Sequence, residues 1–139
     1  MQVKMTFYGF PDNDPPGRAI AFPHSSDPRT LHEEAGGVGT FEDPITTAAA
    51  TGGAFSPGTR LYVPDLKKYL IIEDMCASCE PDQIDVWMES TGDCPSDQVL
   101  ECENTWTPDD PIEVEVEPGP GRALDMKPFF NIQNCDCAK

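Results

Sequence analysis

Basic residues and long apolar runs are scarce in this sequence. Lys and Arg number 9 against 25 Asp and Glu in 139 residues, and the formal net charge of -16 repels both phosphate backbones and anionic lipid surfaces. No stretch approaches the roughly 18 to 20 consecutive apolar residues that a membrane-spanning helix requires. We therefore expect no nucleic-acid partner and no membrane association.

Uninterrupted windows for long helices are also lacking, because 11 Gly and 15 Pro are scattered through the chain without a period. The length suits one hydrophobic core, so we expect a monomer with a single domain over residues 1–139. Apolar and β-branched runs separated by turn residues predict strands instead of helices. The expected strands lie at residues 3–9, 45–50, 59–63, 69–74, 83–88, 112–117 and 126–132, with a further short one at 18–22, and the acidic stretch 89–111 is expected to be a loop.

Six cysteines, all in the second half of the chain, favour three disulfides and a secreted protein. The Cys76-Ala77-Ser78-Cys79 motif could instead hold zinc or act as an intracellular redox pair. No second pair has zinc-ribbon spacing, however, and the motif lies between two expected strands. We therefore expect no metal and no cofactor, and we expect the numbering to belong to a mature form, since no apolar signal core follows the first residue. The expected disulfides join Cys94 to Cys102 and leave Cys76 and Cys79 to bond with Cys135 and Cys137.

The middle of the chain carries four segments in order: Ile45–Ala49, Phe55–Pro64, Tyr69–Asp74 and Ile84–Trp87. Their order and rough spacing resemble those of double-psi β-barrel domains. They look most like the three-aspartate domain of bacterial lytic transglycosylases, in which a second strand ends in Glu-Asp and an Ile-Asp-Leu-aromatic strand follows. The resemblance covers about a third of the chain. It implies an all-β fold, a six-stranded double-psi β-barrel with long disulfide-bonded loops.

Two further segments are similar to parts of secreted expansins and loosenins. The segment Thr6-Phe7-Tyr8-Gly9 is similar to the Thr-Trp-Tyr-Gly strand that opens those barrels, and residues 35–40 look like their glycine-rich turn, which places Gly37 beside the substrate. Expansins and family 45 glucanases also share a His-Phe-Asp strand whose aspartate matches Asp85, with Gln83-Ile84 here in place of His-Phe. The whole layout looks like small secreted fungal proteins of this superfamily.

Asp85 is the candidate proton donor. Side chains alternate along a strand, so Asp85 and Trp87 share one face. Cleavage of a glycosidic bond needs a carboxylic acid whose pKa is raised by burial or by a neighbouring anion. The resemblance places Asp74 in the same groove as a second catalytic carboxylate, with a loop-capping role as its alternative, while Glu73 points the other way and is expected to be structural or solvated. The alternative for Asp85 is an outward-facing, solvated side chain.

Tyr8, Trp87, Asp12 and Gly37 complete the expected site as substrate-binding residues. The phenol of Tyr8 could hydrogen-bond a sugar hydroxyl, and Trp87 could offer a stacking platform, although each could also be an ordinary packed aromatic. Asp12 lies in a turn-forming loop and has a local capping role as its alternative.

The expected function is cleavage of a β-1,4-linked cell-wall polysaccharide. Family 45 glucanases carry their catalytic base two residues after the matching tyrosine, where this chain has Phe10. Asp85 alone could drive attack by the N-acetylmuramic acid 6-hydroxyl, Asp12 or Asp14 could serve as a base, or the groove could only bind. We predict a secreted peptidoglycan muramidase or lytic transglycosylase. The alternatives are an expansin- or loosenin-like protein that binds cellulose or chitin without cleaving it, a family 45-like endoglucanase, and a secreted effector or protease-inhibitor-like protein that uses the barrel only as a scaffold.

Overall fold

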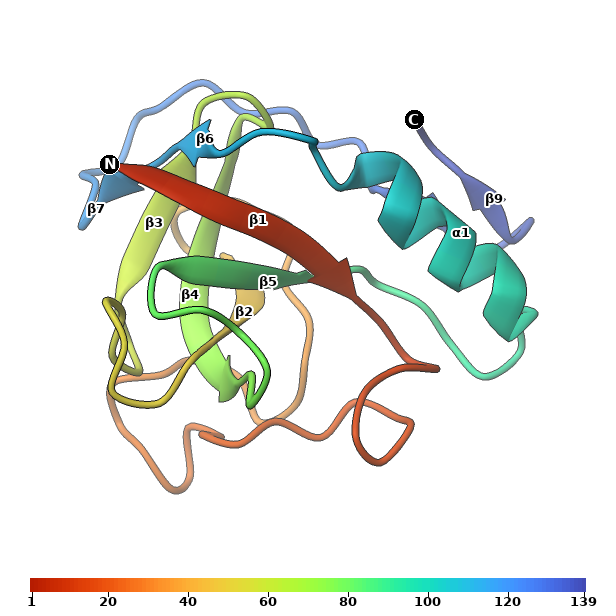
Figure 1. Cartoon of the computed structure of the whole chain (residues 1–139), viewed down its shortest axis with the longest axis horizontal. Helices are drawn as coiled ribbons and strands as arrows, with labels where there is room; N and C mark the ends of the chain where they lie inside the picture. The colour runs from red at the N-terminus through yellow and green to blue at the C-terminus, as the bar shows by residue number, and fades with distance from the viewer.

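A computed structural model covers residues 1–139, and its centre is one seven-stranded sheet (Figure 1). The strand order across this sheet is β6-β1-β5-β2-β4-β3-β7, and a separate two-stranded sheet pairs β8 with β9. The expected count of six barrel strands is therefore corrected to seven. The strands are β1 (Gln2–Tyr8), β2 (Ile45–Ala49), β3 (Arg60–Val63), β4 (Lys68–Met75), β5 (Gln83–Trp87), β6 (Ile112–Glu113), β7 (Glu115–Val116), β8 (Phe130–Asn131) and β9 (Asp136–Cys137).

The main sheet curls into a nearly closed barrel. Its two outermost strands, β6 and β7, are separated in the chain only by Val114. β6 pairs with β1 at one edge and β7 pairs with β3 at the other, both antiparallel. The Val114 N–H donates to the Met1 carbonyl at 2.8 Å at the point where the chain crosses between the two edges. The barrel shape leaves little unpaired strand edge.

The register of β2, β4 and β5 brings two carboxylates together. β2 lies between the other two strands, parallel to β4 and antiparallel to β5. A register shift between Thr47 and Ala48 sets Ala48 opposite Asp74 on β4, and Ala48 also lies opposite Asp85 on β5. Cross-strand partners project from the same side of a sheet, so both carboxylates flank one small side chain.

The barrel interior explains why these segments form strands. β4 is buried along its whole length except at Met75, which is why its sequence is a nearly continuous apolar run. β-branched and aromatic side chains fill the space between the strands, and each fully buried one contributes about 1.5–3 kcal/mol. The largest apolar side chains that are less than 2% exposed are Trp87, Tyr69, Phe130, Leu61, Leu70, Ile71, Ile72, Ile84 and Met88.

The acidic stretch that was expected to be a loop contains the helix α1 (Ser96–Trp106), which packs against β1 (Figure 1). Its buried residues, Val99, Cys102 and Glu103, are spaced three and four apart and therefore share one helix face. Pro95 stands at the N-cap, where the missing proline N–H costs no helix hydrogen bond. No helix of the structure is long and apolar enough to cross a membrane.

Three strand predictions need correction. Residues 112–117 alternate in sequence but form two dipeptide strands, because the chain changes partner strand at Val114, and Val116 is 42% exposed. Residues 126–132 contribute only β8. Residues 18–22 form no strand, and the Phe22 N–H instead donates to the Glu73 carbonyl at 3.0 Å.

The three expected disulfides are present, but the expected pairing was wrong. The bonds join Cys76 to Cys79, Cys94 to Cys135 and Cys102 to Cys137. The six helical steps from residue 96 to residue 102 rise by about 9 Å, which exceeds the roughly 7 Å Cα separation that a disulfide tolerates. Cys94 and Cys102 are consequently separated along α1, and both bond to the C-terminal β8–β9 hairpin. Three disulfides in a chain of this size fit an extracellular protein.

Candidate active site

A cleft of about 570 Å³ opens where Asp74 of β4, Asp85 of β5 and Tyr8 of β1 meet. Asp85 lies on β5 and Asp74 on β4, the two strands that flank β2. The loop that follows β1 supplies two further acids, Asp12 and Asp14. Ala48 forms part of the floor between Asp74 and Asp85. The cleft is lined by Tyr8, Asp12, Asn13, Asp14, Ala19, Ile20, Ala21, Ala48, Asp74, Met75, Cys76, Ala77, Ser78 and Asp85.

Asp85 is the partly exposed acid at the centre of this group. Its Oδ1 accepts a hydrogen bond from the Thr6 hydroxyl at 2.8 Å, across the parallel β1–β5 pair. Burial raises the pKa of Asp85 to about 6; the Thr6 hydrogen bond opposes the rise, and the charges of Asp12 and Asp74 add to it. Asp85 can therefore hold a proton in mildly acidic surroundings, as a general acid must.

Asp74 is held by three donors. Its Oδ2 accepts a hydrogen bond from the Tyr8 hydroxyl at 2.7 Å, and its Oδ1 accepts the N–H groups of Ala21 and Met75, each at 2.9 Å. Burial, followed by the neighbouring Asp74, raises the pKa of Tyr8 well above its ordinary value, which keeps the phenol a donor. Asp74 thus ties β1, the loop around residue 21 and the end of β4 together, and the capping role weighed for it in the sequence is present.

Asp12 lines the cleft and has a second acid, Glu103, behind it. Its Oδ1 accepts the Gly9 N–H at 2.8 Å, which is the local turn contact that an aspartate commonly makes. Behind it, Glu103 of α1 is only 4% exposed, and its Oε2 has no hydrogen-bond partner. Burial raises the pKa of Glu103 to about 10, with the Asp12 contact and the charge of Asp85 adding to the rise. Glu103 is therefore a protonated acid across the neutral pH range.

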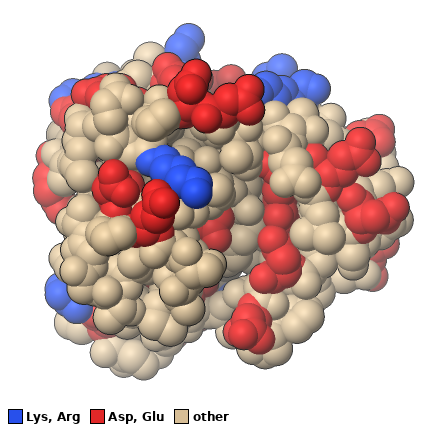
Figure 2. Space-filling view, viewed as in Figure 1, with Lys and Arg blue, Asp and Glu red and all other residues tan.

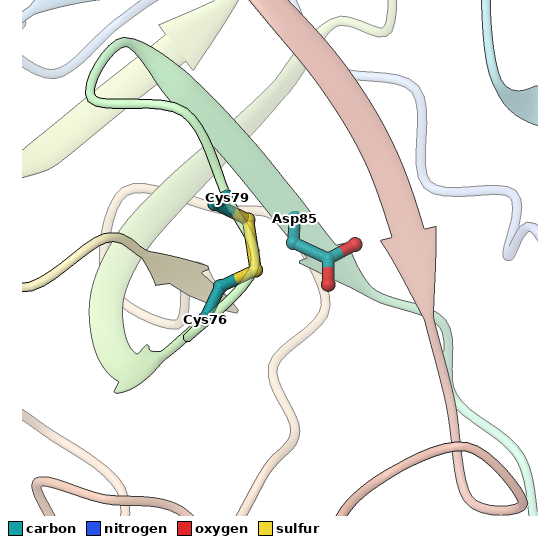
Figure 3. Close-up of side chains that lie close together, drawn as sticks. All are labelled: Cys76, Cys79 and Asp85. Atoms are coloured by element: carbon teal, nitrogen blue, oxygen red, sulfur yellow. A yellow bond between two sulfur atoms is a disulfide. The ribbon is translucent and has the colours of Figure 1, made fainter.

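The Cys76–Cys79 disulfide stands beside Asp85 on the cleft wall (Figure 3). The two sulfur atoms and one carboxylate oxygen of Asp85 lie within 4.8 Å of one another. Disulfide sulfur offers no thiolate to a metal ion, so this cluster does not fit a zinc site in the oxidised protein. Its effect is to place apolar sulfur against one side of the acid, which adds to the desolvation of Asp85.

Two residues that were expected to bind substrate lie elsewhere. Trp87 is 1% exposed, donates its Nε1–H to Glu89 at 2.8 Å and packs edge-on against Tyr8, so its ring has no open face for a sugar. Gly37 has a φ of 99°, and a side chain there would collide with the Pro44 carbonyl oxygen, which gives it a backbone role. Both residues line a separate cleft of about 240 Å³.

A charged cluster on the opposite face of β4 anchors the long loop before β2. Glu73 is fully buried, and its carboxylate contacts the Nδ1 of His32 at 2.7 Å and the hydroxyl of Thr46 at 2.7 Å. The Nε2 of His32 contacts Asp43 at 2.6 Å. The hydrogen bond with Glu73, supported by Asp43, raises the pKa of His32 to about 9, so the imidazole is a cation between two anions. Glu73 is therefore structural.

Glu103 is the residue that sequence reasoning missed. Its signal was present in the spacing of Val99, Cys102 and Trp106, which recur three and four residues apart and follow Pro95. That pattern predicts a helix with Glu103 on its inner face. The acidic composition of the stretch and the expected Cys94–Cys102 bond concealed it.

Charge distinguishes this cleft from a site for anions. Figure 2 shows a hollow in the face that Figure 1 presents, with Asp and Glu side chains along its borders. No Lys or Arg is among the residues that line the 570 Å³ cleft. The arrangement can donate and accept protons, and it favours uncharged, hydroxyl-rich ligands over anionic ones.

The chain belongs to the family described as the DDB_G0273701 N-terminal domain, whose model matches residues 1–138. A curated relative, the uncharacterized protein DDB_G0273701/DDB_G0273221 of Dictyostelium discoideum, is 34% identical over 149 aligned residues. That alignment covers 98% of this chain and 59% of the relative, so the chain spans little more than half of the relative's length. No solved structure matches the chain.

Proposed function

We propose that this protein is a secreted enzyme that cleaves β-1,4 glycosidic bonds of a cell-wall polysaccharide, a muramidase or lytic transglycosylase, with Asp85 as the general acid. The observation that carries the proposal is the position of Asp85 in the cleft with a pKa raised to about 6. A carboxylic acid in that state can protonate the departing glycosidic oxygen. Asp74 and Asp12 keep the surroundings negative, which favours the positive charge that develops on the sugar ring.

The proposal includes a double-psi β-barrel related to expansins and lytic transglycosylases. Its support is the presence of two parallel strand pairs, β1 with β5 and β2 with β4, within one small and otherwise antiparallel barrel. The resemblance drawn from sequence assigns Asp85 to the acid position of those barrels. It also assigns Tyr8 to the groove, and the hydrogen bond from the Tyr8 hydroxyl to Asp74 supports that assignment.

A neutral polysaccharide is the second candidate substrate, and the acidic lining of the cleft favours it. Peptidoglycan carries peptide carboxylates, which a cleft with four aspartates and no Lys or Arg would repel. Cellulose and chitin carry no such groups. A family 45-like glucanase would cleave such a chain, and an expansin-like protein would bind it without cleavage.

The decisive experiment compares wild-type protein with Asp85→Asn on peptidoglycan, cellulose and chitin, with mass spectrometry of the released products. We expect the rate of cleavage to fall by roughly 100-fold or more in the variant, because the proton donor is lost, while the melting temperature stays the same or rises. In the wild type, the rate should decline as the pH rises through about 6. The exposed Asp109→Asn variant is the matched control.

Products identify the reaction. Anhydro ends indicate a lytic transglycosylase, free reducing ends indicate a hydrolase, and a wild type that binds a polysaccharide without fragments is a binding protein. Full activity in Asp85→Asn would rule out the assigned general acid.

A further inference from the structure

The carboxyl group of Glu103 lacks the donors that a buried anion needs. It is 4% exposed, and its Oε2 has no hydrogen-bond donor. The Ser90 hydroxyl, which like Oε2 lies beside Gly9, already donates to the Met88 carbonyl at 2.9 Å. A carboxylate left without donors in such a place would cost several kcal/mol. The physical solution is a proton on Glu103, and the neighbouring carboxyl group of Asp12, on the other side of Gly9, is an acceptor to which that proton can be donated.

Asp12 is the only one of the two acids that reaches the cleft. It lines the same hollow as Asp85, whereas Glu103 lies behind it on the buried face of α1. Gly9 packs the pair closely, because a side chain there would come within 3.0 Å of Glu103 Oε2. The Gly9 N–H holds one oxygen of Asp12 at 2.8 Å, so Gly9 adjoins both the Asp12 carboxyl group and Glu103 Oε2.

We propose that Asp12 is the proton acceptor that activates water opposite the general acid Asp85, and that Glu103 is the positioning residue that holds Asp12 by donating a proton to it. This inference rests on the proposed function and selects hydrolysis within it. It also supplies a base that the sequence lacks at the position used by family 45 glucanases, where Phe10 stands.

The proposed step balances. A water oxygen bonds to the anomeric carbon as the bond from that carbon to the glycosidic oxygen breaks. Asp12 takes a proton from the water, and Asp85 gives its proton to the departing oxygen. Exchange with solvent then returns the proton from Asp12 to Asp85, and Glu103 keeps its own proton throughout.

The charged groups that act on this pair come from three elements. Glu103 on α1 faces Asp12 in the loop after β1 and Asp85 on β5. Both neighbours are acidic, so each disfavours a negative charge on Glu103. No cation is among the groups that shift its pKa.

The test uses Asp12→Asn, Glu103→Gln and Glu103→Leu, with Glu101→Gln on the exposed face of the same helix as control. Asp12→Asn should lower the rate of hydrolysis by roughly 100-fold or more. Glu103→Gln retains an N–H donor of the same shape, so its rate of hydrolysis should stay within about threefold of the wild-type rate. Glu103→Leu removes the donor, so its rate of hydrolysis should fall by about tenfold or more, and the acidic limb of its pH–rate profile should shift to higher pH. A merely structural role for Glu103 would leave that limb unchanged.

An infrared measurement tests the pair without reference to activity. The difference spectrum between wild type and Glu103→Gln at neutral pH should contain a protonated carboxylic acid band. Absence of that band, or full activity in Asp12→Asn, would overturn the inference. A wild type that cleaves no polysaccharide would overturn the proposed function and the catalytic role of Asp12 together, while the infrared band would still decide whether the proton lies on Glu103.

Discussion

Two buried glutamates in this molecule have opposite protonation states. Glu73 is 0% exposed and Glu103 is 4% exposed, yet the pKa of Glu73 is lowered and that of Glu103 is raised to about 10. Burial alone would raise both. At Glu73 the rise is outweighed by hydrogen bonds from His32, from Thr46 and from the N–H groups of Leu31 and His32. Glu103 has no such donors and faces an acidic neighbour.

Asp85 is the intermediate case. It has one side-chain donor, Thr6, and its pKa is about 6. The comparison shows that the supply of donors, more than the depth of burial, decides whether an acid in this barrel serves as an anchor or as a proton carrier. Glu73, the structural anchor, and the cleft residue Asp74 are consecutive on β4, so their side chains project from opposite faces of that strand.

The largest change in the free energy of unfolding is expected from replacing Glu73, the buried carboxylate that anchors the long loop before β2. Glu73→Gln leaves the cationic His32 and two backbone N–H groups without their carboxylate, and we expect it to lower the free energy of unfolding by about 3 kcal/mol or more at pH 6. Urea unfolding measures this loss, with the exposed Glu42→Gln as control. A loss below about 1 kcal/mol would show that the donors around Glu73 contribute little.

An effect of opposite sign is expected at the other glutamate. Because the folded-state pKa of Glu103 is raised to about 10 from an ordinary value of 4.5, its contribution to stability is complete below pH 4.5 and is lost progressively up to about pH 10. Glu103→Gln does not titrate. Above pH 4.5, the free energy of unfolding of the Glu103→Gln variant relative to that of the wild type should therefore rise by about 1.4 kcal/mol per pH unit. The difference should reach about 3 kcal/mol at pH 7.

Denaturant unfolding of both proteins at pH 4.5, 6 and 7.5 checks the slope, with Glu101→Gln as control. A stability difference that does not change with pH would mean that Glu103 is ionised in the folded protein.

The smallest effect concerns the intermediate acid. Thr6→Val keeps the shape of the side chain and removes the hydroxyl that donates to Asp85. The pKa of Asp85 should rise above about 6 by roughly one unit, because a hydrogen bond to a charged group is worth about 1.5 kcal/mol. An NMR titration of the Asp85 carboxyl carbon measures this shift. An unchanged or lower pKa would contradict the role given to the donor.

Sequence patterns located the five long strands of the barrel because each is an apolar or alternating run bounded by turn residues. Sequence patterns failed where a segment changes its partner strand. Residues 112–117 alternate well enough for one strand, but Val114 lies at a crossing between two sheet edges that no local pattern reveals. The helix α1 was missed because its inner face includes Glu103, an acid in a position where periodicity analysis expects an apolar residue.

The candidate site was partly predictable. Asp85, Asp74, Tyr8 and Asp12 were expected in one groove, and the structure has all of them lining one cleft. Trp87 shares a strand face with Asp85 in the alternating pattern, but neighbouring segments cover it. Which residues of a barrel strand stay open depends on the loops above them, and loop positions are not encoded in strand periodicity.

The amino-acid sequence by itself determined the acidic charge, the strands of the barrel and the presence of three disulfides, because composition, alternation and cysteine count are local properties of the chain. The tertiary structure decided the disulfide partners, the meeting of Asp74 and Asp85 around Ala48, and the contact between Asp12 and Glu103. Each of these depends on distances between segments far apart in the chain. The protonation of a buried acid depends on which donors those distances supply, and for that reason Glu73 and Glu103 could not be told apart before the fold was known.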